Sequence, residues 1–188
     1  KPNAIQNLVP IATNWKANDW LIGNVLVQDA ILNNSKNPIH DARLHAMLLY
    51  RSPESLTAKF NSERNDNQNS YKVESWLLHH GEKLTSRFEL SAYKLMNHLL
   101  KTIGENTTKK DLQDFAKISP TKIHQIAVNS DYFFAPNENV KTHNLLSNLK
   151  KNLTYHEINS IHGHDAFLIE YERLNNILKT IFNTKQTH

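Results

Sequence analysis

The 188-residue sequence has no cysteine and only four glycines, and each shortage excludes particular kinds of site. Without cysteine the chain cannot form disulfide bonds, bind zinc through thiolates or use a cysteine nucleophile. The glycines stand singly, at positions 23, 81, 104 and 163. The chain therefore contains neither a glycine-rich phosphate-binding loop nor the Gly-x-Ser-x-Gly turn that carries the nucleophile of many serine enzymes.

Basic clusters and long apolar runs are also missing. The net charge is +4, but the only adjacent basic pairs are Lys109–Lys110 and Lys150–Lys151. A nucleic-acid-binding surface needs clustered basic residues, and a membrane helix needs about 20 consecutive apolar residues. The N-terminus also lacks the charged-then-apolar pattern of a signal peptide. We expect no nucleic-acid partner, no membrane partner and a cytoplasmic location.

Three short apolar segments, 8–12, 123–128 and 153–158, have the pattern of buried strands. Near-continuous apolar runs are typical of parallel strands that are covered on both faces. A helical pattern over 140–151 separates the second and third segments, which predicts a βαβ unit. After Gly163, apolar residues recur every three or four positions as far as Ile181, which predicts an amphipathic C-terminal helix.

The residues between the first and second strands show helical periodicity and no strand. We expect helices near 18–31, 41–51, 52–60, 71–80 and 91–103. Asn18 and Ser52 are predicted helix caps. The polar segment 61–70 is expected to be a loop, and 104–110 a linker. The predicted domains are an α/β core portion, 1–14 and 111–188, and a helical domain, 15–110.

Asp131 lies just past the end of one predicted strand, and His164 lies just past the end of the next. Because neighbouring parallel strands end at a common edge of a sheet, these side chains are expected to meet there. An aspartate that accepts a hydrogen bond from a histidine fixes its tautomer and stabilises the imidazolium. The order acid-then-histidine matches the order in α/β-hydrolases. Two alternatives stay open: Asp131 is a turn residue, or the pairing is fortuitous in a chain with 11 histidines.

His162 and His164 could also suggest a metal site. No third ligand lies at a recognisable spacing from them, and the chain has no His-Glu-x-x-His helix. We expect no metal and no permanently bound cofactor.

Several motifs together resemble one enzyme family. The most specific is Gly163-His164-Asp165-Ala166-Phe167-Leu168, preceded by Ser160. Weaker matches support it: Val9–Ala12, Glu74–Leu77, Gly81–Leu84 and Ser130–Phe134. They resemble the C-terminal half of the homoserine O-acetyltransferases, acyltransferases with an α/β-hydrolase fold. The resemblance implies about three late parallel strands of that fold, with a helical lid inserted between them.

The resemblance also implies a ping-pong reaction. A serine takes an acetyl group from acetyl-CoA, the co-substrate, and the side-chain hydroxyl of L-homoserine then accepts it. His164 would be the general base and Asp131 its partner. Arg43 would bind the homoserine carboxylate with help from Tyr50, which lies seven residues later on the same predicted helix face. Asp165 would hold the substrate ammonium, and the lid would mediate a homodimer.

The sequence departs from the family in lacking the nucleophile. Ser160 follows a strand, but its neighbours are too bulky for a sharp nucleophile turn. We therefore expect a missing N-terminal half that carries the serine, an isolated chain without activity, and an open sheet edge at the first strand. Ser91-Ala92-Tyr93 and Ala135-Pro136 also differ from the usual family pattern. The remaining alternatives are a serine O-acetyltransferase, a homoserine O-succinyltransferase, an esterase-like hydrolase and a non-enzymatic helical interaction module.

Overall fold

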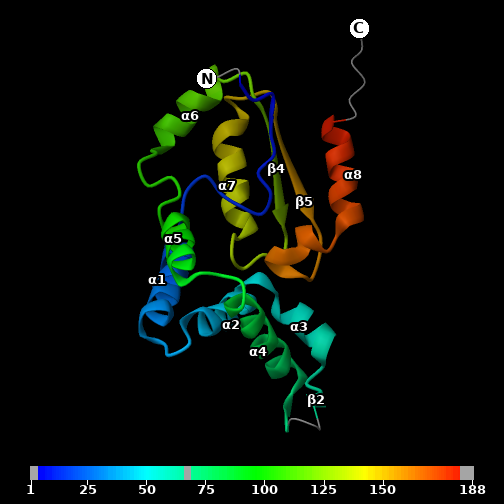
Figure 1. Cartoon of the computed structure of the whole chain (residues 1–188). Coiled ribbons are helices and arrows are strands. Elements are labelled where there is room, and N and C mark those ends of the chain that lie inside the picture. Colours follow the sequence, from blue (N-terminus) through cyan, green and yellow to red (C-terminus); the bar gives the residue numbers. More distant parts are fainter. Residues whose placement is uncertain (1–3, 66–68, 183–188) are drawn as a thin grey trace. The chain divides into compact units, whose positions relative to one another are not determined.

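The chain forms two compact units in the computed structural model, which describes residues 4–65 and 69–182 (Figure 1). Unit 1 comprises Lys1–Asn14 and Asn106–His188, and unit 2 comprises Trp15–Glu105. The chain thus leaves unit 1 once, folds unit 2 and returns. The return comes at Asn106, a few residues before the expected position 111.

Unit 1 is built on a sheet of three parallel strands, which confirms the predicted α/β class. The strands are β1 (Asn7–Leu8), β4 (Lys122–Val128) and β5 (Leu153–Ile158), in the order β1-β4-β5. Ile123 pairs with Leu153, and the ladder runs in register to Val128 and Ile158. As a result, β4 and β5 end side by side at one edge.

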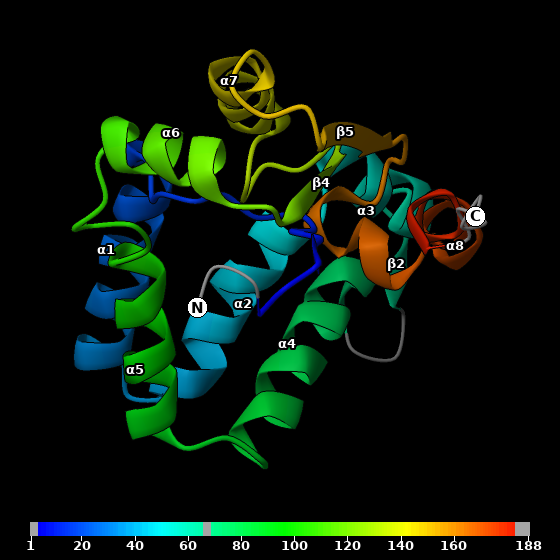
Figure 2. The ribbon, with the colours of Figure 1, turned by 90° about the horizontal axis from the view of Figure 1, so that it is seen from above.

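Two helices cover opposite faces of this sheet (Figure 2). They are α7 (Pro136–Ser147), the crossover between β4 and β5, and α8 (Tyr171–Phe182). Every residue of β4 after Lys122 is buried. The core on the α8 side contains Ala12, Ile126, Val128, Ile158, Ala166 and Ile181. β5 is only partly buried because it forms an edge of the sheet, so the expectation of a fully covered strand was wrong there.

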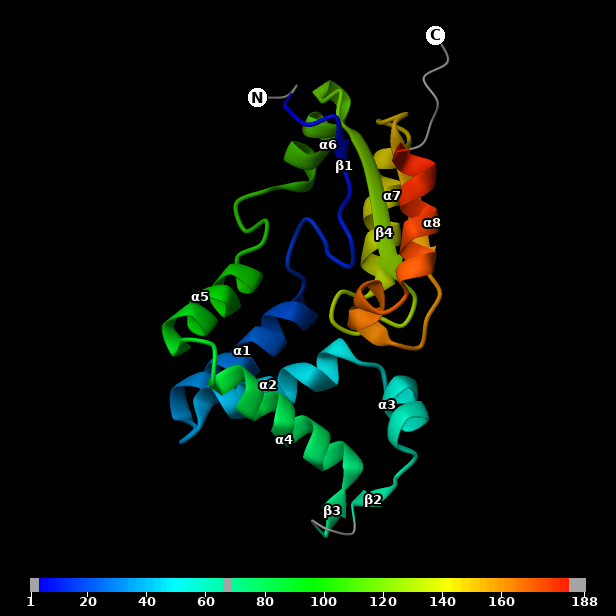
Figure 3. The ribbon, with the colours of Figure 1, turned by 45° about the vertical axis from the view of Figure 1, so that its right-hand side comes forward.

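The first strand is shorter than the predicted segment 8–12. Regular pairing with β4 covers only Asn7 and Leu8, and a single bridge between Ile11 and Ile126 follows (Figure 3). Pro10 lies between them and has no N–H to donate, although its carbonyl accepts a hydrogen bond from the Ile126 N–H (2.9 Å). β1 lies at one edge of the sheet, as expected.

The helices of unit 1 differ from the predictions in their bounds. The crossover helix α7 begins at Pro136, in agreement with the preference of proline for a first helical turn. The segment after Gly163 forms a 3₁₀ helix, η1 (Gly163–Leu168), and α8 begins only at Tyr171. A single continuous C-terminal helix was therefore a wrong prediction.

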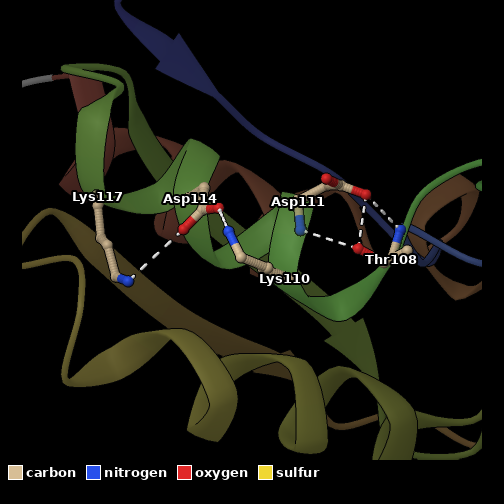
Figure 4. Close-up of polar contacts among 5 residues, drawn as sticks. All are labelled: Thr108, Lys110, Asp111, Asp114 and Lys117. Carbon is tan, nitrogen blue, oxygen red and sulfur yellow. Dashed lines mark hydrogen bonds and ion pairs between the residues drawn. The ribbon is translucent and has the colours of Figure 1, made fainter.

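The helix α6 (Lys109–Ile118) was not predicted at all. Figure 4 shows the capping box that starts it. The Thr108 hydroxyl accepts the Asp111 N–H (3.1 Å), and the Asp111 carboxylate accepts the Thr108 N–H (2.9 Å). Asp114 forms exposed ion pairs with Lys110 and Lys117, which contribute little stability. The Thr-x-x-Asp spacing is the sequence signal that could have revealed this helix.

Unit 2 is helical, and both predicted caps are confirmed. Asn18 Oδ1 accepts the Leu21 N–H (2.9 Å) and Ser52 Oγ accepts the Ser55 N–H (3.0 Å). The helices are α1 (Asp19–Asn34), α2 (Pro38–Tyr50), α3 (Pro53–Phe60), α4 (Lys72–Thr85) and α5 (Leu90–Lys101).

The polar segment 61–70 is not purely a loop. Two-residue strands, β2 (Arg64–Asn65) and β3 (Ser70–Tyr71), pair antiparallel within it. Strands of two residues carry no apolar periodicity, so the pattern gave no sign of them. No helix in the described part of the chain has the length and apolar character needed to cross a membrane.

Candidate active site

Asp131 lies in the turn that follows β4, and its carboxylate is held by the backbone. The side chain is completely buried. Its Oδ1 atom accepts hydrogen bonds from the N–H groups of Phe133 (2.7 Å) and Phe134 (2.9 Å). These two donors fix the carboxylate plane and leave Oδ2 to interact with His164.

His164 lies in η1, after β5, and meets Asp131 as the sequence predicted. Its Nδ1 is 2.9 Å from Asp131 Oδ2. The imidazole packs against the rings of Phe133, Phe134 and Phe167, with centroid distances of 5.3, 5.7 and 5.6 Å. Its side chain is 16% exposed. Because the carboxylate engages Nδ1, a proton exchanged with a substrate would pass through Nε2.

The backbone at Gly163 adopts a left-handed conformation with φ +69°. A side chain is disfavoured there, which accounts for the glycine that precedes His164. The N–H of Gly163 is bound by the hydroxyl of Ser130, the residue before Asp131. Sequence reasoning missed this role of Ser130, and its position beside the acid was the only signal for it.

Arg43 and Tyr50 come together on α2, in unit 2. The Arg43 guanidinium lies over the Tyr50 ring, 5.2 Å from its centroid. Such stacking keeps the guanidinium plane oriented. Tyr93 on α5 is electrostatically coupled to both residues, and burial raises the pKa of its phenol. Its hydroxyl donates to Gln28 Oε1 at 3.4 Å.

The structure thus defines two groups of predicted site residues. Asp131, His164 and Asp165 belong to unit 1, where Asp165 follows His164 in η1. Arg43 and Tyr50 belong to unit 2. The binding roles of Arg43, Tyr50 and Asp165 stay predictions.

Other features of the described residues offer no alternative centre at this edge of the sheet. Within 4–65 and 69–182, no three His, Cys, Asp or Glu side chains are grouped so that they could hold a metal ion. An open pocket of about 440 Å³ is lined by Ile5, Gln6, Asn7, Pro120 and Lys122. It lies where β4 begins, whereas the dyad lies beyond the point where β4 ends.

Comparison with known sequences gives a consistent result. The chain is 29% identical to the homoserine O-acetyltransferase of Nostoc punctiforme and 32% identical to that of Cyclobacterium marinum, and each alignment covers 95% of the chain. The chain is related to the homoserine O-acetyltransferases. The resemblance seen in its motifs is thereby confirmed. A homoserine O-succinyltransferase of Janthinobacterium sp. is 28% identical over 78% of the chain. No family model matches.

The chain spans about half the length of these homoserine O-acetyltransferases, 54% and 52% respectively. Solved structures show the fold. The chain superposes on the homoserine O-acetyltransferase of Staphylococcus aureus with a TM-score of 0.75 and 20% identity, over 97% of this chain and 53% of that one. It superposes on the homoserine O-acetyltransferase of Bacillus anthracis with a TM-score of 0.78 and 13% identity, over 96% of this chain and 54% of that one. It superposes similarly on esterase E22, with a TM-score of 0.74 and 11% identity, over 94% of this chain and 54% of that one. An α/β hydrolase, MGS-M2, also superposes with a TM-score of 0.67 and 18% identity, over the whole of this chain and 59% of that one.

Proposed function

We propose that this protein transfers an acetyl group from acetyl-CoA to the side-chain hydroxyl of L-homoserine, as a step in methionine biosynthesis. The observation that carries the proposal is the pairing of the buried Asp131 with the partly exposed His164 beyond the carboxyl ends of adjacent parallel strands. It lies in a chain whose relatives are named for this activity.

The proposed chemistry has two half-reactions with one base. His164 takes the proton of a serine hydroxyl at Nε2 as that oxygen attacks the thioester, and the proton then passes to the departing CoA sulfur. In the second half-reaction His164 takes the homoserine hydroxyl proton and returns it to the serine oxygen. Asp131 holds the Nδ1–H tautomer and stabilises the imidazolium in both. We assign the serine to a part of the protein outside these 188 residues.

Recognition of the acceptor is assigned to three side chains. Arg43 pairs with the homoserine carboxylate, because its planar guanidinium suits bidentate binding. Tyr50 stacks against that guanidinium and keeps it oriented. Asp165 binds the ammonium group. An amino-acid acceptor bound in this way distinguishes the enzyme from an esterase, whose acceptor is water. We further propose that unit 2 mediates a homodimer.

The test measures CoA release by the native protein with a thiol reagent. The chain contributes no thiol of its own to the background. We expect release from acetyl-CoA to depend on homoserine and to exceed release with serine as the acceptor or succinyl-CoA as the donor. Preference for serine or for succinyl-CoA would assign the other acyltransferase activity instead.

The matched variants are His164→Ala and His162→Ala, two histidines that lie two positions apart. Loss of the general base should lower kcat by about 10²–10⁴-fold, whereas His162→Ala should retain activity. Equal activity of the two variants would refute the role of His164, whereas absence of any acyl transfer by the native protein would favour the non-enzymatic alternative.

A second candidate is an esterase, since the fold likeness to esterase E22 is nearly as close. An esterase would hydrolyse acetyl-CoA or simple acetyl esters at the same rate with and without homoserine. Homoserine-dependent release, with O-acetylhomoserine detected as the product, would exclude it.

A further inference from the structure

Three hydrogen bonds join the loops that carry the dyad without involving the dyad itself. The Ser130 hydroxyl donates to the Ser160 carbonyl (2.5 Å) and accepts the Gly163 N–H (3.0 Å). Asn129 Oδ1 accepts the Ser160 N–H (2.8 Å). These bonds link the turn after β4 to the turn after β5, about 30 residues further along the chain. They lie immediately beside Asp131 and His164.

The bond between Ser130 and Gly163 has a particular relation to the dyad. Ser130 precedes Asp131, and Gly163 precedes His164. The hydrogen bond between Ser130 and Gly163 is therefore one residue before the bond between Asp131 and His164, both in the turn after β4 and in the segment after β5. A shift of one loop relative to the other would lengthen both bonds together.

The aromatic contacts of the histidine do not supply this restraint. Phe133, Phe134 and Phe167 pack around the imidazole, but ring contacts of this kind persist over centroid distances of about 4.5–7 Å and so tolerate small slides. A hydrogen bond weakens steeply as its angle and distance depart from the optimum. The Ser130 hydroxyl donates its single hydrogen to Ser160 and accepts a hydrogen bond from Gly163. It therefore holds the segment after β5 at two points.

We propose that Ser130 is a positioning residue, whose hydroxyl sets the spacing of the two loops and so keeps His164 Nδ1 bonded to Asp131. Asn129 adds a second restraint on the same loop. The effect on acyl transfer rests on the function proposed above. The effect on the geometry of the dyad does not, because it concerns only the bond between Asp131 and His164.

Four variants separate positioning from general stability. Ser130→Ala removes both bonds of the hydroxyl. Ser130→Thr restores a hydroxyl, and Ser130→Cys keeps the size of the side chain but has only a weak S–H donor. The matched control is Ser147→Ala, which deletes an exposed hydroxyl of α7 that donates to the Asn144 carbonyl (3.3 Å).

The primary measurement is the low-field proton NMR resonance of His164 Nδ1–H in the native protein, identified by its absence in His164→Ala. We expect Ser130→Ala to shift the signal upfield or to broaden it by faster exchange with water. Ser130→Thr and Ser147→Ala should keep the wild-type signal. If homoserine acetylation is observed, kcat of Ser130→Ala should also fall about ten- to a hundredfold, since small misplacements of a catalytic group have costs of this size. KM for homoserine should stay within twofold, because the Ser130 hydroxyl is engaged by Ser160 and Gly163 and is not among the side chains assigned to the acceptor.

An unchanged low-field signal in Ser130→Ala would overturn the proposal. Should that variant fail to fold, Ser130→Cys decides in the same way: a weakened signal supports positioning and an unchanged signal refutes it. Absence of homoserine acetylation in the wild-type protein would refute the proposed function alone. The NMR result would still decide the role of Ser130.

Discussion

Substitution of Asp131 should separate the catalytic role of its carboxylate from its structural role. In Asp131→Asn, the amide oxygen can still accept the N–H groups of Phe133 and Phe134. The amide nitrogen then faces His164 Nδ1 and can only donate to it, so the imidazole must carry its proton on Nε2. That tautomer cannot act as a base at Nε2. The same exchange in a Ser-His-Asp triad lowers kcat about 10⁴-fold, and we expect a loss of this order.

Asp131→Ala should instead destabilise unit 1. It leaves the N–H groups of Phe133 and Phe134 without their acceptor, and each unsatisfied buried donor costs about 1–3 kcal/mol. Because Phe134 is only partly buried, we expect the lower part of the combined range, about 2–4 kcal/mol. Asp131→Asn should lose less than about 1 kcal/mol, since these two bonds survive.

The assay for stability is urea denaturation followed by far-UV circular dichroism. Circular dichroism is preferred to tryptophan fluorescence, because Trp15, Trp20 and Trp76 all lie in unit 2 and none lies in unit 1 of these 188 residues. With a loss of about 2–4 kcal/mol and a slope of about 1–3 kcal/mol per molar urea, the midpoint for unit 1 should fall by about 0.7–4 M in Asp131→Ala. Equal destabilisation of the Asn and Ala variants, or wild-type activity in Asp131→Asn, would refute the reasoning.

Three further predictions concern unit 2. A methyl group on Gly81 would come within 2.4 Å of His40 Cδ2, so Gly81→Ala should lower the free energy of unfolding, measured by urea denaturation, by about 1–3 kcal/mol. The control is Gly23→Ala, which has no atom within 4 Å of the added methyl group and should stabilise its helix by about 0.5–1 kcal/mol. Burial lowers the pKa of His45, so the folded state binds its proton less readily and stability should fall as the pH drops below about 6.5. Urea denaturation followed by tryptophan fluorescence at pH 7.5 and 5.5 measures this change, and a urea midpoint that does not depend on pH would contradict it. In His45→Gln the free energy of unfolding should depend less steeply on pH. Arg43→Lys should raise KM for homoserine at least about tenfold, roughly 1.4 kcal/mol, with kcat little changed; an unchanged KM would remove Arg43 from the acceptor site.

Local sequence signals predicted those elements whose cause is local. The caps at Asn18 and Ser52 act within three residues, and both were found where their residue types indicated. The strand β4 was recognisable because burial on both faces favours a mostly apolar run, which Ile123 and Ile126–Val128 provide around the buried polar pair His124–Gln125. β5 was also found at the predicted positions, Leu153–Ile158, but the expectation that it is buried on both faces was wrong, because it lies at a sheet edge. Whether a strand has one neighbour or two is a property of the assembled sheet.

The candidate site shows the same division. The positions of Asp131 and His164 after predicted strands were enough to pair them, because a parallel sheet brings such ends to one edge. Nothing in the spacing indicated that Phe133 and Phe134 donate to the carboxylate, or that Ser130 ties the two loops together. Those bonds depend on turn conformations, including the left-handed Gly163, which composition and periodicity do not specify.

The sequence by itself determined the α/β class, the succession of β4, α7 and β5, the meeting of Asp131 with His164 and the likeness to homoserine O-acetyltransferases. Each follows from patterns within a few residues or from motifs that keep their spacing along the chain. Only the tertiary structure decided which oxygen of Asp131 meets His164, which donors hold the other oxygen, and how Ser130 joins the two loops. The bonds from Phe133 and Phe134 lie within one turn and depend on its backbone conformation. The bonds that join Asp131 to His164 and Ser130 to Gly163 cross about 30 residues of chain, so they depend on the pairing of β4 with β5, which no local pattern encodes.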